Sequence, residues 1–110
     1  MSNLASTTDR INALLDRIER GDYPDRARLE ETLTDGYAWA LKLDAECGRL
    51  ERRISVNAAQ LADETSEETA RELSALARLL SRRRDERDAL RRLLVVLKSG
   101  AAQEAKAGVA

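Results

Sequence analysis

The chain has 110 residues, of which 43% are hydrophobic and 35% charged, and its net charge at pH 7 is −1. Because this charge is close to zero, no global field draws the protein toward nucleic acid or an anionic membrane. Histidine is absent and cysteine occurs once, which excludes a histidine acid/base, an intrachain disulfide and a cysteine-based metal site. We therefore expect a non-enzymatic protein without cofactor or metal.

The composition predicts an all-α fold. Phenylalanine is absent and aromatic residues make up only 3% of the chain, so the core must be built mainly from leucine and alanine. Such residues in narrow stripes are typical of long helices with thin packing seams. No apolar run approaches the ~20 residues that span a bilayer, and residues 1–10 lack the features of a signal peptide. We expect a cytoplasmic protein without membrane contact.

The first predicted helix spans residues 7–20. Residues 6–9 offer several N-cap oxygens, and Gly21 suits the left-handed geometry that follows a helix end. The second helix is predicted over 24–63, with Pro24 in its first turn, where the missing N–H costs little. The apolar face of the first helix consists of Ile11, Leu14, Leu15 and Ile18.

Two heptad stripes that are out of phase predict a hairpin. The first runs from Leu29 to Leu61 and the second from Leu73 to Leu97, and continuing the first would place charged residues in the seam. One straight helix cannot present both stripes to the same partner, so we expect the chain to fold back near residues 62–66. A continuous helix from residue 24 to 99 is the alternative, because this turn contains neither glycine nor proline.

The third helix is predicted over 66–99. Thr65 and Glu68 have capping-box spacing, and Ser99-Gly100 is a helix-end signal. Residues 101–110 have no apolar face worth burying, which predicts a flexible tail. The expected architecture is a single helical domain over 1–100, with a short N-terminal helix and a long antiparallel hairpin.

The small and polar exceptions to the two stripes should meet when the hairpin is laid antiparallel. Arg83 and Arg87 interrupt the second stripe, and they fall opposite Gly36 and Ala40, with Asp44 nearby. In the structural interpretation the arginine stems cover the small residues and the guanidinium groups reach Asp44 or Asp35. In the functional interpretation the same residues form an anion pocket. Dimer contacts are a third possibility.

Other candidates border this zone. Tyr37 and Trp39 are interpreted as core or dimer packing, or alternatively as part of a ligand site. Gly36 and Gly48 each cost ~1 kcal/mol inside a helix, which favours close approach of another helix, with a hinge or a pocket wall as the alternative. Residues 82–87 are arginine-rich, but neighbouring acids offset half of the charge and no aromatic residue interleaves for base stacking.

The sequence favours an interaction module over a catalyst. The apolar area of the two long helices exceeds what one short helix can cover, and an uncovered apolar strip is an interaction site. We expect a dimeric bundle that binds a protein partner. The alternatives are a regulator that binds an anionic ligand or nucleic acid through the arginine-rich third helix, and an enzyme that uses arginines to stabilise an anionic transition state.

Overall fold

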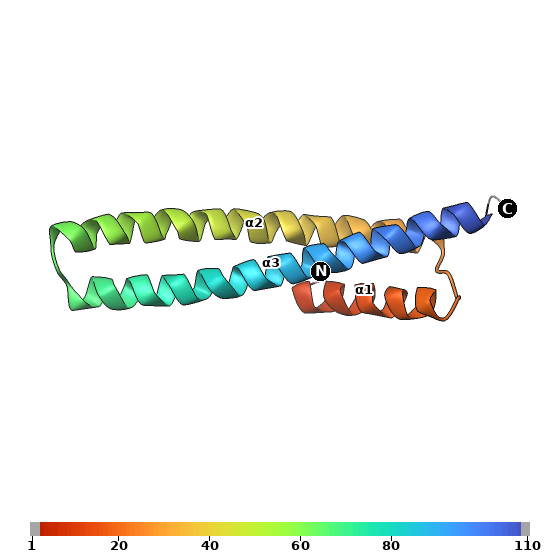
Figure 1. Cartoon of the computed structure of the whole chain (residues 1–110), viewed down its shortest axis with the longest axis horizontal. Helices are drawn as coiled ribbons and strands as arrows, with labels where there is room; N and C mark the ends of the chain where they lie inside the picture. The colour runs from red at the N-terminus through yellow and green to blue at the C-terminus, as the bar shows by residue number, and fades with distance from the viewer. Residues whose placement is uncertain (1–2, 109–110) are drawn as a thin grey trace. The chain divides into compact units, whose positions relative to one another are not determined.

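The computed structural model describes the backbone of residues 3–108 and the side chains of residues 3–103. It contains three helices, α1 (Leu4–Glu19), α2 (Arg26–Asp63) and α3 (Glu67–Gly108), shown in Figure 1. No strand occurs in residues 3–108, and α2 and α3 pack against each other as an antiparallel hairpin. The all-α hairpin prediction is therefore confirmed, and the continuous-helix alternative is wrong.

α1 begins before the predicted start at residue 7. The side chain of Asn3 accepts a hydrogen bond from the Ser6 backbone N–H at 2.7 Å, so Asn3 is the N-cap. Asparagine is among the strongest N-capping residues, and with Asn3 as the cap the helix begins at Leu4, ahead of the candidates at 6–9. The helix ends at Glu19, and Gly21 follows with φ of 79°, the left-handed conformation expected from the sequence.

Side chains that precede the two long helices set where those helices begin. Asp25 Oδ1 accepts a hydrogen bond from the Ala27 N–H at 2.8 Å, so α2 begins at Arg26 and the buried Pro24 lies in the preceding link. Ser66 Oγ accepts from the Thr69 N–H at 3.3 Å, so Ser66 caps α3 in place of the predicted Thr65. Each of these corrections moves a helix start by only one or two residues.

The predicted end of the third helix is wrong, because α3 continues past Ser99 to Gly108. Gly100 is buried against α1, and a Cβ at this position would lie 3.2 Å from Ile18 Cδ1. The glycine therefore permits close helix packing instead of ending the helix. Of the predicted flexible tail 101–110, residues 101–108 are helical in their backbone, and residues 109–110 lie outside the described residues.

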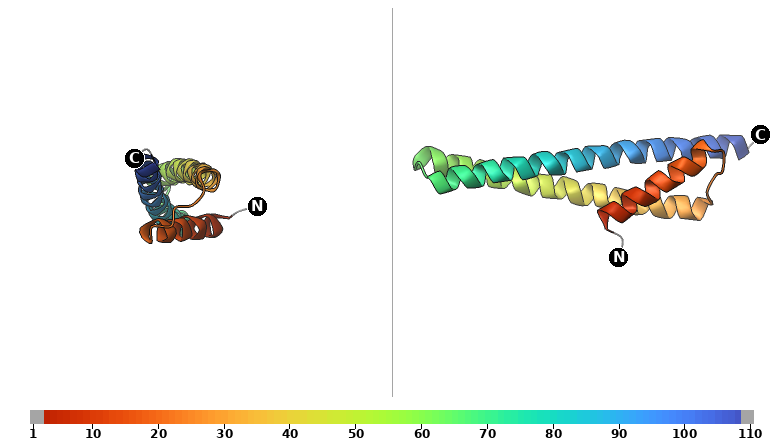
Figure 2. Two further views of the ribbon diagram at one scale, coloured as in Figure 1. Left: turned by 90° about the vertical axis from the view of Figure 1, so that its right-hand side faces the viewer. Right: turned by 90° about the horizontal axis from the view of Figure 1, so that it is seen from below.

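The chain divides into two compact units, residues 1–40 with 88–110 and residues 41–87. In the first unit, α1 packs against the start of α2 and the second half of α3 (Figure 2). The buried apolar residues of this unit come from all three helices, as the sequence predicted for helix one. They are Ile11, Leu14, Leu29, Ala40, Leu90, Leu94 and Leu97.

The second unit is a two-helix hairpin with a thin core. Cys47 and Leu50 of α2 pack with Leu76 and Leu80 of α3, and Ile54 and Leu79 cover this cluster. These are the positions that the out-of-phase stripes predict, apart from Leu79, which comes from a flanking stripe. Cys47 is 1% exposed and behaves as a small apolar residue, as expected.

None of the helices in residues 3–108 combines enough length with enough hydropathy to cross a bilayer.

Candidate functional site

Arg83, the first of the seam arginines, is held by two carboxylates in the second unit. Its Nε donates to Glu46 Oε1 at 2.9 Å and its Nη1 to Glu86 Oε1 at 3.0 Å. The hydrogen bond to Glu46, followed by the charges of Glu46 and Glu86, raises the pKa of Arg83 above its ordinary value. Two of the three guanidinium nitrogens, Nε and Nη1, therefore donate to acids of the protein itself.

Arg87 and Arg84 extend this arrangement into a ladder of ion pairs between α3 and α2. Arg87 Nη1 donates to Asp44 Oδ1 at 3.0 Å, and Arg84 Nη2 donates to Glu51 Oε1 at 2.9 Å. The Arg87 side chain is only 18% exposed, because its stem is covered while its head reaches the carboxylate. The Asp44 partner is confirmed for Arg87, whereas for Arg83 the sequence prediction is wrong, because Glu46 takes that place.

Loss of the Arg83 side-chain charge is expected to cost about 1 kcal/mol of stability, at the upper end for partly exposed ion pairs. In Arg83→Gln the carboxylates of Glu46 and Glu86 remain close to each other without a cation between them. Urea unfolding followed by circular dichroism measures the loss. Arg78→Gln is the control, because Arg78 is exposed and forms no ion pair with the described residues.

The same prediction includes a pH dependence with a defined sign. A raised arginine pKa contributes stability that is fully present below the unfolded-state pKa and is lost only as the pH rises through the folded-state pKa. Wild type and Arg83→Gln differ in their free energy of unfolding. The part of this difference that comes from titration of Arg83 should stay constant from neutral to mildly alkaline pH. A difference that shrinks between those limits would contradict the assignment.

The small residues of the predicted zone lie in the first unit. A Cβ on Gly36 would collide with Leu94 Cδ2 and lie 3.5 Å from Ile11 Cδ1, so α1 and α3 both approach α2 at this glycine. Close helix approach is confirmed here. Ala40 is also buried, at 6% exposure. Gly36 and Ala40 belong to the first unit, whereas Arg83 and Arg87 belong to the second.

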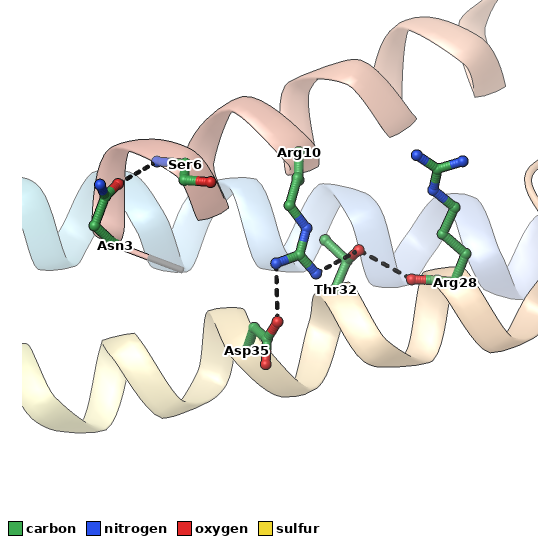
Figure 3. A network of polar contacts seen from close by, with 6 residues as sticks. All are labelled: Asn3, Ser6, Arg10, Arg28, Thr32 and Asp35. Carbon is green, nitrogen blue, oxygen red and sulfur yellow. Dashed lines mark hydrogen bonds and ion pairs between the residues drawn. The ribbon is translucent and has the colours of Figure 1, made fainter. Parts of the chain in front are cut away.

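A polar network around Arg10 was missed by the sequence analysis. Arg10 Nη1 donates to Asp35 Oδ2 at 2.9 Å and Nη2 donates to Thr32 Oγ1 at 3.3 Å, which ties α1 to α2 (Figure 3). The Thr32 hydroxyl donates in turn to the Arg28 carbonyl at 2.9 Å. The sequence predicts Asp35 as a partner of Arg83 or Arg87, whereas in the structure its partner is Arg10. Arg10 lies one position before the buried Ile11, and that flanking place was the available signal.

The aromatic candidates are not enclosed in a ligand site. Tyr37 is 43% exposed and Trp39 is half-buried, both in the first unit. Two adjacent valines on α3 of the same unit, Val95 and Val96, are 63% and 54% exposed. Large apolar side chains thus remain at the surface of this unit even though α1 covers its core.

Gly48 does not mark a close helix approach, so that interpretation of this glycine is wrong. A Cβ there would meet only the Nη1 atom of Arg52 on the same helix, at 3.5 Å. Gly48 instead borders a shallow hollow of about 560 Å³ that is lined by Gly48, Glu51, Arg52, Ser55 and Val56. This hollow lies on the face of α2 that is turned away from the Cys47–Leu50 core.

Two further sources of functional evidence are a metal site and similarity to known proteins. Within the described part of the chain, no group of three or more acidic or cysteine side chains could hold a metal ion. No protein family model, no curated protein and no solved structure matches the chain. The function must therefore be argued from the surfaces themselves.

Proposed function

We propose that this chain is a non-enzymatic helical-hairpin module that binds a protein partner and associates with itself. The observation that carries the proposal is the set of large apolar side chains that the helices leave exposed. Burial of exposed apolar side chains by a partner is favourable, because it removes their surface from water. They are Tyr23, Tyr37, Leu41, Val56, Val95 and Val96, between 40% and 72% exposed.

The ion-pair ladder supports this function over the alternative of an anionic-ligand or nucleic-acid regulator. Binding to phosphates requires arginine or lysine side chains whose charged groups can contact the ligand. Arg83, Arg84 and Arg87, the centre of the arginine-rich third helix, donate to acids of α2 or α3 instead. An anionic ligand would have to displace these carboxylates, which weakens its binding.

The proposal is tested by capture of a partner on Val95 and Val96 of the first unit. Immobilised wild-type chain should retain a stoichiometric protein from native lysate, and Val95→Gln/Val96→Gln should retain about tenfold less, because two apolar contacts are lost. Ala13→Gln, at an exposed position on α1, is the matched control and should retain as much as wild type. Equal retention by all three chains would contradict partner binding through these valines.

A further inference from the structure

Three residues on α2 of the second unit form a self-complementary row. Arg49, Val56 and Asp63 follow one another at seven-residue intervals, so they lie on one face of the helix at steps of about two turns, or ~10 Å. All three are exposed, and Val56 has 56% of its surface accessible. The row therefore reads cation, apolar residue, anion along the helix.

The charges at the two ends of this row belong to Arg49 and Asp63. Among the described residues, none forms an ion pair with Arg49 or with Asp63. Their neighbours behave differently, because Glu51 pairs with Arg84 and Arg53 pairs with Glu72 across the hairpin. The hairpin ladder thus engages the flanks of α2 and leaves the outward row without internal partners.

The surface around Val56 is open to the approach of another helix. Two shallow hollows, of about 560 and 280 Å³, adjoin Val56, and both are lined by Val56 and Arg52. Gly48 lies in the larger one, and no other helix in the described part of the chain packs against it to explain a glycine inside a helix. On the same side of α2, Ser55 and Ala59 are small and exposed.

We propose that this face of α2 binds the same face of a second copy of the chain in antiparallel orientation. Val56 then lies on the two-fold axis against Val56 of the second copy. Because Arg49 precedes Val56 by as many residues as Asp63 follows it, this register places Arg49 of each copy opposite Asp63 of the other. The inference rests on the self-association in the proposed function and gives it a surface and a register.

Charge decides the orientation of the two helices. In a parallel pair with the same contact, Arg49 would face Arg49 and Asp63 would face Asp63, and both contacts are repulsive. In the antiparallel pair both become attractive. An isologous contact of this kind closes on itself, so the expected assembly is a dimer and not a filament.

Charge reversal in the full-length chain tests this register. Sedimentation velocity over a range of concentrations should show a dimer for the wild type. Arg49→Glu and Asp63→Arg should each weaken dimerisation at least about tenfold, because the two-fold axis repeats every change twice. The double variant Arg49→Glu/Asp63→Arg restores both opposite-charge contacts and should return the dimerisation constant to within about threefold of wild type.

A disulfide trap tests the position of the two-fold axis. Val56→Cys should form a disulfide-linked dimer when the reductant is removed, because the two introduced thiols face each other. Cys47 is buried and does not compete. Ala77→Cys, exposed on α3 of the same unit, is the control and should remain unlinked under the same conditions.

The outcomes separate this inference from partner binding. A wild-type chain that stays monomeric at all concentrations overturns self-association, while the capture experiment on Val95 and Val96 still decides partner binding on its own. A dimer that is insensitive to both charge reversals, or that is not trapped by Val56→Cys, overturns this face and register. Restored dimerisation of the double variant, together with a disulfide-linked Val56→Cys dimer, supports both the proposed face of α2 and its register.

Discussion

Replacement of Leu94 by alanine is expected to lower the free energy of unfolding by about 3 kcal/mol, the middle of the range for buried leucines. Leu94 is 1% exposed, and its Cδ2 atom occupies the space in which a Cβ of residue 36 would otherwise lie. The alanine leaves a cavity against Gly36, where the backbone of α2 cannot collapse to fill it. Urea unfolding by circular dichroism measures the loss, and an unchanged midpoint would contradict this packing.

A second substitution shows whether the cavity is where we expect it. Gly36→Ala alone should cost about 1–2 kcal/mol, because the overpacking against Leu94 exceeds the gain in helix propensity. In the Leu94→Ala background the collision is gone, so the same change should become stabilising. Gly48→Ala is the matched control and should stabilise both backgrounds by about 1 kcal/mol, since its Cβ meets only a flexible arginine.

Asn57→Leu is expected to raise the free energy of unfolding by about 1–2 kcal/mol, the usual cost of an unsatisfied buried donor. Asn57 is 9% exposed at a seam position of α2, and its Nδ2 has no hydrogen-bond partner among the residues that the structure describes. Leucine removes this donor and continues the apolar stripe. Thermal and urea unfolding should both report the gain.

The neighbouring Gln60→Leu serves as the control for that gain. Gln60 is exposed, so the same leucine at this position should change the stability by no more than about 0.5 kcal/mol. If Asn57→Leu gave no gain, or a loss, the amide would have to find a partner in solution. The interpretation of Asn57 as an unsatisfied seam residue would then be wrong.

The hairpin could be predicted from the sequence because burial follows heptad phase. Cys47, Leu50, Leu76 and Leu80 form the core of the second unit because each lies on the inward stripe of its own helix. The heptad spacing of apolar residues can be read from the sequence and does not depend on side-chain rotamers. The turn followed from it, although no turn residue marked its position.

The arginine partners could be predicted only in part, because a long flexible side chain can reach several acids. Asp44 and Glu46 both flank the seam at the height of the arginines, so spacing alone does not assign either of them. Arg87 takes Asp44, and Arg83 takes Glu46 together with Glu86 of its own helix. The choice depends on rotamers, which one-dimensional spacing does not encode.

Glycines were the least predictable feature, because one residue type serves three purposes in this chain. Gly21 provides a positive φ, Gly36 makes room for a leucine, and Gly48 faces outward. Ser99-Gly100 predicts a helix end, because a capping glycine and a contact glycine look the same in a sequence. The contact with Ile18 distinguishes them, and it depends on a helix at the other end of the chain.

The packing of Ile11 and Leu94 over Gly36 also has a consequence for synthesis of the chain. Residues 41–87 form a unit that is continuous in the sequence, so this hairpin can close as soon as its own residues leave the ribosome. The binding site of α1 is not complete until residues near 94 have emerged. α1 precedes both long helices in the sequence, yet its apolar face is expected to stay accessible to chaperones until the residues near 94 have been made.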